Sequence, residues 1–75
     1  MDNRALEAER ILASEAFKYA IDRAHERKKE EWTRARSQAE REALWLQYHA
    51  LDDVTTELRV IVEDAKVNDK LKGDD

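Results

Sequence analysis

Two histidines and the carboxylates near them are the residues of this chain whose types could support metal chemistry. His49, Asp53 and Glu57 are spaced i, i+4 and i+8, so on a helix they would lie along one side. Imidazole and carboxylate groups in such a row can chelate a divalent cation. The same spacing is typical of a solvated helix surface, and we favour that interpretation. We therefore predict no metal ligands.

Enzymatic chemistry has less support. His25 belongs to no paired Glu-x-x-His motif of the kind that di-iron helical bundles need. The sequence contains no recognisable nucleophile–base pair. Gly73 is the only glycine, so a glycine-rich phosphate loop is excluded. We predict that the protein is not an enzyme and that it has no catalytic residues and no cofactor.

The composition predicts the long helices that would position these residues. The 75-residue chain has no proline, no cysteine, one glycine and 43% charged residues. This composition is typical of long helices, and it leaves packing alone to hold one small domain. No stretch has the roughly 18 consecutive apolar residues that a membrane span requires, so we expect no membrane partner.

The first half of the chain predicts one helix. Good helix formers run without a breaker over residues 3–32, and Asp2 or Asn3 is the expected N-cap. Apolar residues recur there at the i, i+3, i+4, i+7 spacing of a single buried stripe. The stripe consists of Leu6, Ala13, Phe17, Ala20, Ile21 and Ala24. Its alanines would let a second helix approach closely.

A connection is predicted at residues 33–38, where the apolar periodicity lapses. Ser37 and Glu40 have the spacing of a capping box directly before an apolar run. A second helix is therefore expected over 39–68, followed by a polar tail over 69–75. The alternative is one unbroken helix through the connection, because neither glycine nor proline forces a stop. The predicted fold is all-α: an antiparallel two-helix hairpin that oligomerises into a helical bundle or coiled-coil assembly.

The second helix carries the clearest periodicity. Leu44, Leu51 and Leu58 are seven residues apart, and Val54 and Ile61 hold the second apolar position of their heptads. A further apolar set lies on another side of the same helix, and two apolar faces call for two neighbours. One neighbour is the first helix, and the other is a copy of the chain or a different protein. The predicted interface residues are Leu44, Leu46, Leu51, Val54, Leu58, Val60, Ile61 and Val62, with Trp45 and Tyr48.

Aromatic residues cluster around the predicted connection. Trp32 and Trp45 flank it, and Tyr48 lies one turn after Trp45 on the same side. We favour a small local core that fixes the turn. The alternative is an interface anchor, because tryptophan and tyrosine are typical hot-spot residues.

Charge is distributed unevenly along the chain. Residues 1–41 hold 10 Lys/Arg against 9 Asp/Glu, whereas residues 42–75 hold 4 against 9. In the more basic half the acids are interleaved at helical spacing, as in the pair Glu26 and Lys29. This pattern argues against direct nucleic-acid binding, which needs a basic face. The acidic half could imitate a polyanion and block the basic groove of another protein.

Several short motifs resemble a group of small helical proteins of tailed bacteriophages and prophages, often encoded near head and DNA-packaging genes. The motifs are R-A-L-E-A-E-R-I-L over 4–12, E-A-F, the isolated Trp32, R-E-A-L-W over 41–45, A-L-x-x-V over 50–54, and E-D-A-K-V. The likeness spans residues 4–67. It implies a phage origin and a non-enzymatic assembly or accessory role, and it supplies no active-site residues.

These observations lead to three functional hypotheses. The leading one is a phage interaction or assembly protein that forms a homo-oligomer, a dimer or higher, and contacts phage or host proteins. The second is a phage effector whose acidic half inhibits a host protein such as a defence nuclease or RNA polymerase. The weakest is a nucleic-acid-binding dimer that uses the basic turn end. For a phage-encoded chain without a targeting signal, we expect the host cytoplasm, with virion association as the alternative.

Overall fold

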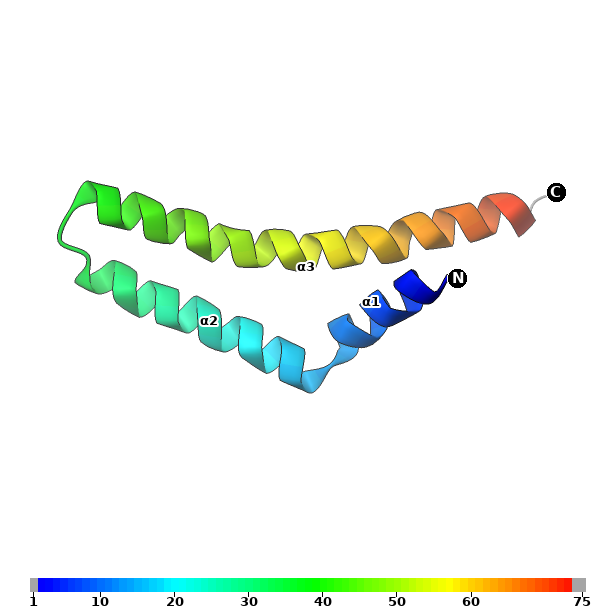
Figure 1. The fold of residues 1–75 in the computed structure, drawn as a ribbon, viewed down its shortest axis with the longest axis horizontal. Coiled ribbons are helices and arrows are strands. Elements are labelled where there is room, and N and C mark those ends of the chain that lie inside the picture. Colours follow the sequence, from blue (N-terminus) through cyan, green and yellow to red (C-terminus); the bar gives the residue numbers. More distant parts are fainter. Residues whose placement is uncertain (1, 74–75) are drawn as a thin grey trace.

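Three helices make up the computed structural model of the chain. It describes residues 2–73, with side chains for 2–71. The helices are α1 (Asn3–Ala13), α2 (Glu15–Arg34) and α3 (Gln38–Gly73). α1 and α2 follow one another along the length of α3 and run antiparallel to it (Figure 1). The predicted all-α class is confirmed for the described residues, which contain no strand.

The expected single helix over 3–32 is wrong, because the chain breaks at Ser14. Its backbone is extended (φ −69°, ψ 126°), and its N–H donates to the Ile11 carbonyl at 3.0 Å. Its hydroxyl accepts a hydrogen bond from the Phe17 N–H at 3.2 Å. Ser14 therefore closes α1 and caps α2, a role that serine fills well because its short side chain competes for backbone groups. The expected two-helix hairpin thus has three helices.

The turn between α2 and α3 occupies residues 35–37. The Ser37 hydroxyl accepts from the Glu40 N–H at 3.1 Å, and the Glu40 carboxylate accepts from the Arg36 N–H at 3.0 Å. These bonds satisfy backbone donors at the start of α3, as a capping box does. The alternative of an unbroken helix through 33–38 is excluded.

α3 is longer than the sequence pattern predicts. It continues past the expected end at about residue 68 as far as Gly73, so the expected polar tail is helical over 69–73. Lys70 and Leu71 are good helix formers, and no glycine or proline intervenes before Gly73. Positions 74–75 of the expected tail lie outside the described residues.

The buried core is small and lies between α1 and the C-terminal half of α3. Ala5, Ala8, Val62 and Ala65 are the buried apolar residues of the described chain, and α2 contributes no buried residue. Alanine side chains let the two helix axes approach closely. The core between α1 and α3 is therefore formed by small side chains.

The molecule is a single layer of helices. α1 and α2 both lie along one side of α3 (Figure 1), and the principal dimensions are 59 × 24 × 13 Å. The radius of gyration is 16.9 Å, against about 11 Å for a compact domain of this length. Domains normally need two packed layers to enclose a core. Both broad faces of this layer are therefore open.

Candidate protein-interaction surface

The inner face of α3, which packs on α1 and α2, contains half of the predicted interface residues. Leu44, Leu51 and Leu58 are half-buried on it. Tyr48 is half-buried and Val62 is buried. These positions are four, three, seven and four residues apart, so they follow one stripe along the helix. These predicted interface residues therefore pack within the chain.

Val54 and Ile61 lie beside that stripe rather than in it. Thr55 takes the inward position and is half-buried, whereas Val54 is 57% exposed. Ile61 is half-buried beside the buried Val62. A heptad pattern allows the third or the fourth residue after each leucine to point inward, and this chain uses the fourth. Val54 therefore lies outside the intrachain stripe, and its assignment to an interface stays a prediction.

One broad face of the layer carries apolar and charged residues side by side. In right-handed helices packed antiparallel, the residue before each inward position lies on the same broad face in both helices. We call this surface the valine face. Its uncharged members are Ile11 on α1, Ala16 and Ala20 on α2, and Gln47, Ala50, Val54 and Ile61 on α3, and its charged members are Arg4, Glu7, Arg27, Glu57 and Asp64. All of these residues except Ile61 are exposed.

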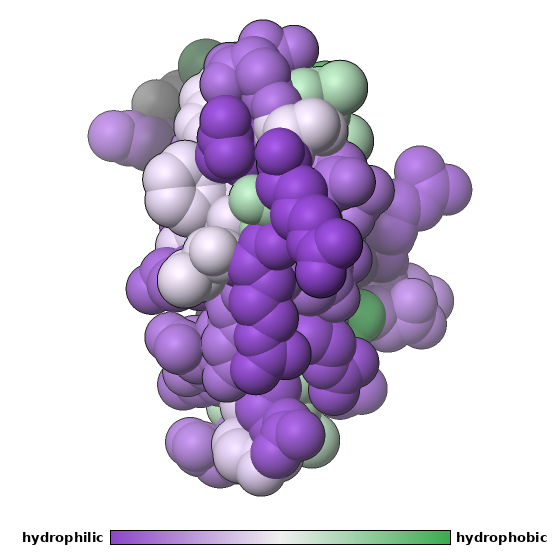
Figure 2. Space-filling model, turned by 90° about the vertical axis from the view of Figure 1, so that its left-hand side faces the viewer, coloured by the Kyte–Doolittle hydropathy of each residue, from purple (hydrophilic) through white to green (hydrophobic). Residues whose placement is uncertain are grey.

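The view onto the turn end shows side chains of both kinds. Hydrophilic atoms run down the middle and reach out on both sides, and smaller hydrophobic groups lie between them (Figure 2). The right-hand side is the broad face that points toward the viewer in Figure 1. That face therefore carries hydrophilic as well as hydrophobic side chains.

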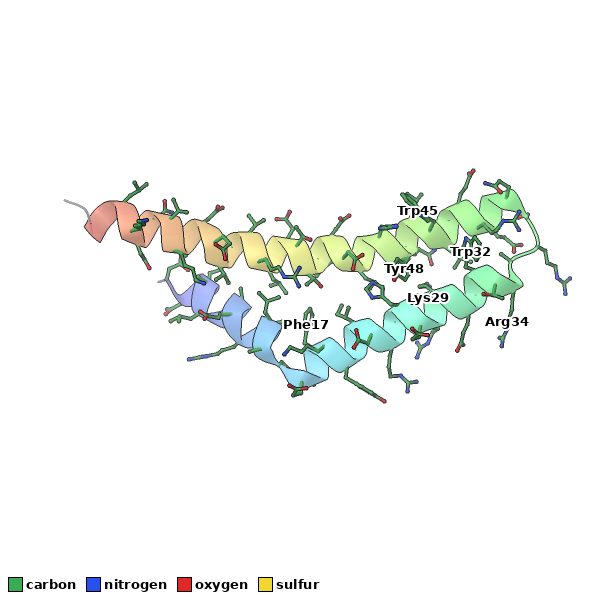
Figure 3. All side chains as sticks on the ribbon, turned by 180° about the vertical axis from the view of Figure 1, so that it is seen from behind. Phe17, Lys29, Trp32, Arg34, Trp45 and Tyr48 are labelled. Carbon is green, nitrogen blue, oxygen red and sulfur yellow. The ribbon has the colours of Figure 1, made fainter. Side chains whose placement is uncertain are left out.

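The opposite broad face carries charge and two exposed tryptophans, and we call it the tryptophan face. Trp32 is 48% exposed and Trp45 is 57% exposed. Both lie near the turn, with Tyr48 one helical turn further along α3 (Figure 3). The two indoles together line two shallow grooves of about 470 and 290 Å³. The local core expected at the turn is thus only partly shielded from solvent.

A small polar cluster joins α2 to α3 on this face. The ring centroids of Trp45 and His49 are 4.2 Å apart, and those of His25 and Tyr48 are 4.3 Å apart. Asp52 lies between the two histidines, with Oδ1 3.1 Å from His25 Nε2 and Oδ2 4.0 Å from His49 Nδ1. His25 Nε2 is buried and makes no aligned hydrogen bond. A protonated His25 would pair with Asp52 across the two helices.

The row of possible metal ligands on α3 is a surface row. Asp53 and Glu57 are exposed, while His49 contacts Trp45 and Asp52. Within residues 2–71, no group of three or more histidines and carboxylates is arranged to hold a metal ion.

The outer edge of α3, opposite its inner face, carries the remaining predicted interface residues. Leu46 is 63% exposed, and Val60 and Val67 repeat its position at seven-residue intervals. Asp53 shares this spacing, and Glu57 lies one turn away. The edge therefore mixes apolar and acidic side chains.

Comparison with known proteins gives no functional lead. No family model matches the chain, and neither a curated protein nor a solved structure does. In the part of the chain that the structure describes, no helix combines the length and apolar character that crossing a membrane requires. Function is therefore inferred from the geometry of the chain itself.

Sequence reasoning did not identify three components of these surfaces. Ile11 and Ala20 belong to the valine face, and His25 pairs across the layer with Asp52. Ala20 follows the helical spacing of the predicted buried stripe, yet it is exposed. The only signal for the His25–Asp52 pair is the register between the two halves of the chain, which helical periodicity alone does not define.

Proposed function

We propose that this chain is a non-enzymatic interaction protein that acts by self-association. The observation that carries the proposal is its accessible surface. A compact monomer of 8.8 kDa exposes about 4,800 Å², whereas this chain exposes 6121 Å². The excess of about 1,300 Å² is larger than the roughly 800 Å² that each partner buries in a standard interface.

The energetics of the isolated layer support the same conclusion. Burial of apolar side chains is the main favourable term in folding, at about 25 cal/mol per Å². The buried apolar residues within 2–71 are three alanines and one valine. Covering a broad face with a second layer would supply the missing burial.

The resemblance to small phage proteins suggests where such a module would act. An interaction protein without catalytic machinery would serve particle assembly or a related step, through contacts between its own copies and with other phage proteins. This role depends on the proposed self-association.

A mass measurement in solution tests the proposal. Sedimentation equilibrium at micromolar concentration should give a dimer or a larger species, because the open faces would be covered. A monodisperse species of 8.8 kDa at that concentration would contradict self-association.

The outer edge of α3 favours a second candidate function, the inhibition of a host protein. Leu46, Val60 and Val67 are exposed there beside Asp53 and Glu57. Apolar side chains bordered by acids suit a partner with a basic, partly apolar groove. Exchanging Asp53 for lysine should abolish capture of such a host protein. It should leave the self-association of the chain unchanged.

A further inference from the structure

We infer that two copies of this chain associate by exchanging α1, so that α1 of each copy packs on α3 of the other. In the exchanged dimer the bend at Ser14 is straightened, and α1 and α2 form one helix over residues 3–34. The bent chain described above is the monomer. The inference rests on the proposed self-association and adds the contact through which it occurs.

Ser14 is the hinge of this exchange. It is the only residue between α1 and α2, and neither glycine nor proline interrupts residues 3–34. Its φ of −69° is already a helical value, so rotation of its ψ from 126° to about −40° joins the two helices. The bend is held by the Ser14 N–H on the Ile11 carbonyl and by the Phe17 N–H on the Ser14 hydroxyl. A continuous helix replaces these two bonds with its own backbone ladder.

The helical phase of the inward residues determines where α1 points once the bend is straight. The inward positions on these two helices include Ala5, Ala8, Leu12, Phe17, Ile21 and Ala24. They follow one another at steps of three or four residues, except for the step of five from Leu12 to Phe17. In an unbroken helix a step of five turns about 140° beyond a full turn. While α2 stays on its own α3, the inward stripe of α1 therefore points away from that helix.

A second copy offers the surface that this stripe already fits. In the bent chain Ala5 and Ala8 of α1 are buried, as are Val62 and Ala65 of α3. The α3 helix of a second copy presents the same shape and the same bordering charges. Exchange therefore remakes the contact without any new complementarity, which makes domain swapping a low-cost route to a dimer.

A two-fold axis along the length of the layer, lying between two stacked layers, brings the exchanged helices together. This axis keeps the α3 helices of both copies parallel to each other and level along their length. α1 then remains antiparallel to the α3 on which it packs, as it is in the bent chain (Figure 1). The same axis places the partner's α3 on the side opposite to the chain's own α3. That is the side to which the stripe of α1 points.

The two exchanged helices cross at the hinge. Ala13, Ser14 and Ala16 have small side chains, and both alanines are exposed in the bent chain. Small side chains let two helices cross at a short distance. The stacked layers also cover one broad face of each chain, which supplies the burial that a single layer lacks.

Ser14→Ala and Ser14→Gly test the exchange as a matched pair. Both remove the hydroxyl, but alanine favours the interior of a helix and glycine disfavours it. At an N-cap the order is reversed, because glycine is preferred to alanine there. Each dimer contains two hinges, so the effect counts twice. In sedimentation equilibrium we expect a dimer dissociation constant at least tenfold below that of the wild type for Ser14→Ala, and none below it for Ser14→Gly.

The backbone of Ser14 provides a second measurement on the wild-type chain. The chain has two serines, Ser14 and Ser37, so labelling with ¹³C-serine gives two Cα signals. With rising protein concentration the Ser14 signal should move from the extended to the helical range of chemical shift. Ser37 caps α3 in both forms, and its signal should stay in place.

The outcomes separate the exchange from self-association itself. A wild-type dimer that Ser14→Ala does not tighten, or that Ser14→Gly tightens equally, overturns the exchange and leaves self-association standing. A dimer in which Ser14 keeps its extended chemical shift has the same meaning, because both chains then keep the bend. A protein that stays monomeric over the whole concentration range overturns both proposals.

Discussion

The two ends of this molecule hold the same long helix in different ways. At the open end, α1 packs on α3 through Ala5 and Ala8 against Val62 and Ala65, all buried. At the turn end, α2 faces α3 with aromatic and histidine side chains, and none of its residues is buried. Small side chains allow close packing of two helices, whereas large rings keep them apart and leave grooves. One end is therefore a core, and the other is a surface.

The largest loss of stability is expected from a charge placed in the core at the open end. Ala8→Asp would bury an uncompensated carboxylate between α1 and α3, at a cost of about 3–5 kcal/mol. We expect that urea unfolding of this variant at pH 7, monitored by circular dichroism, is no longer cooperative. Ala13→Asp, an exposed alanine of the same helix, is the matched control and should cost less than about 1 kcal/mol. Equal effects of the two variants would mean that α1 does not form the core.

Removing the helix cap at Ser14, between the two ends, should cause an intermediate loss of stability. Ser14→Ala deletes the hydroxyl that caps α2 at the Phe17 N–H. The expected loss is about 1 kcal/mol in the free energy of unfolding, since helix caps contribute roughly that amount. Ser14→Asp keeps an acceptor at the cap and should restore most of the loss. If alanine and aspartate behave alike, the cap does not stabilise the bend.

The smallest change is expected at the turn end. Trp45→Ala removes a half-exposed ring whose centroid lies 4.2 Å from that of the tilted His49 ring. Aromatic pairs contribute about 0.5–1.5 kcal/mol beyond burial, so unfolding by urea should shift by about 1 kcal/mol. A loss as large as that of Ala8→Asp would show that the turn end is a core after all.

The helical periodicity predicted much of the fold, but it did not predict every residue that points toward the inner face of α3. Composition and heptads predicted helices, the capped turn at Ser37 and the stripe of Leu44, Leu51 and Leu58. They did not decide between Val54 and Thr55, because both lie within reach of the inner face and packing against α2 makes the choice. Propensity also missed the break at Ser14, where one serine hydroxyl outweighs a run of good helix formers.

The central claim, that this chain is one layer of a two-layer bundle, is tested most directly by the dependence of unfolding on protein concentration. If folding and association are coupled, a hundredfold rise in concentration should stabilise the native state by about 2.7 kcal/mol and move the urea midpoint upward. A midpoint that stays constant over that range, with full helicity at the lowest concentration, would contradict the claim. The single layer would then be a stable monomer.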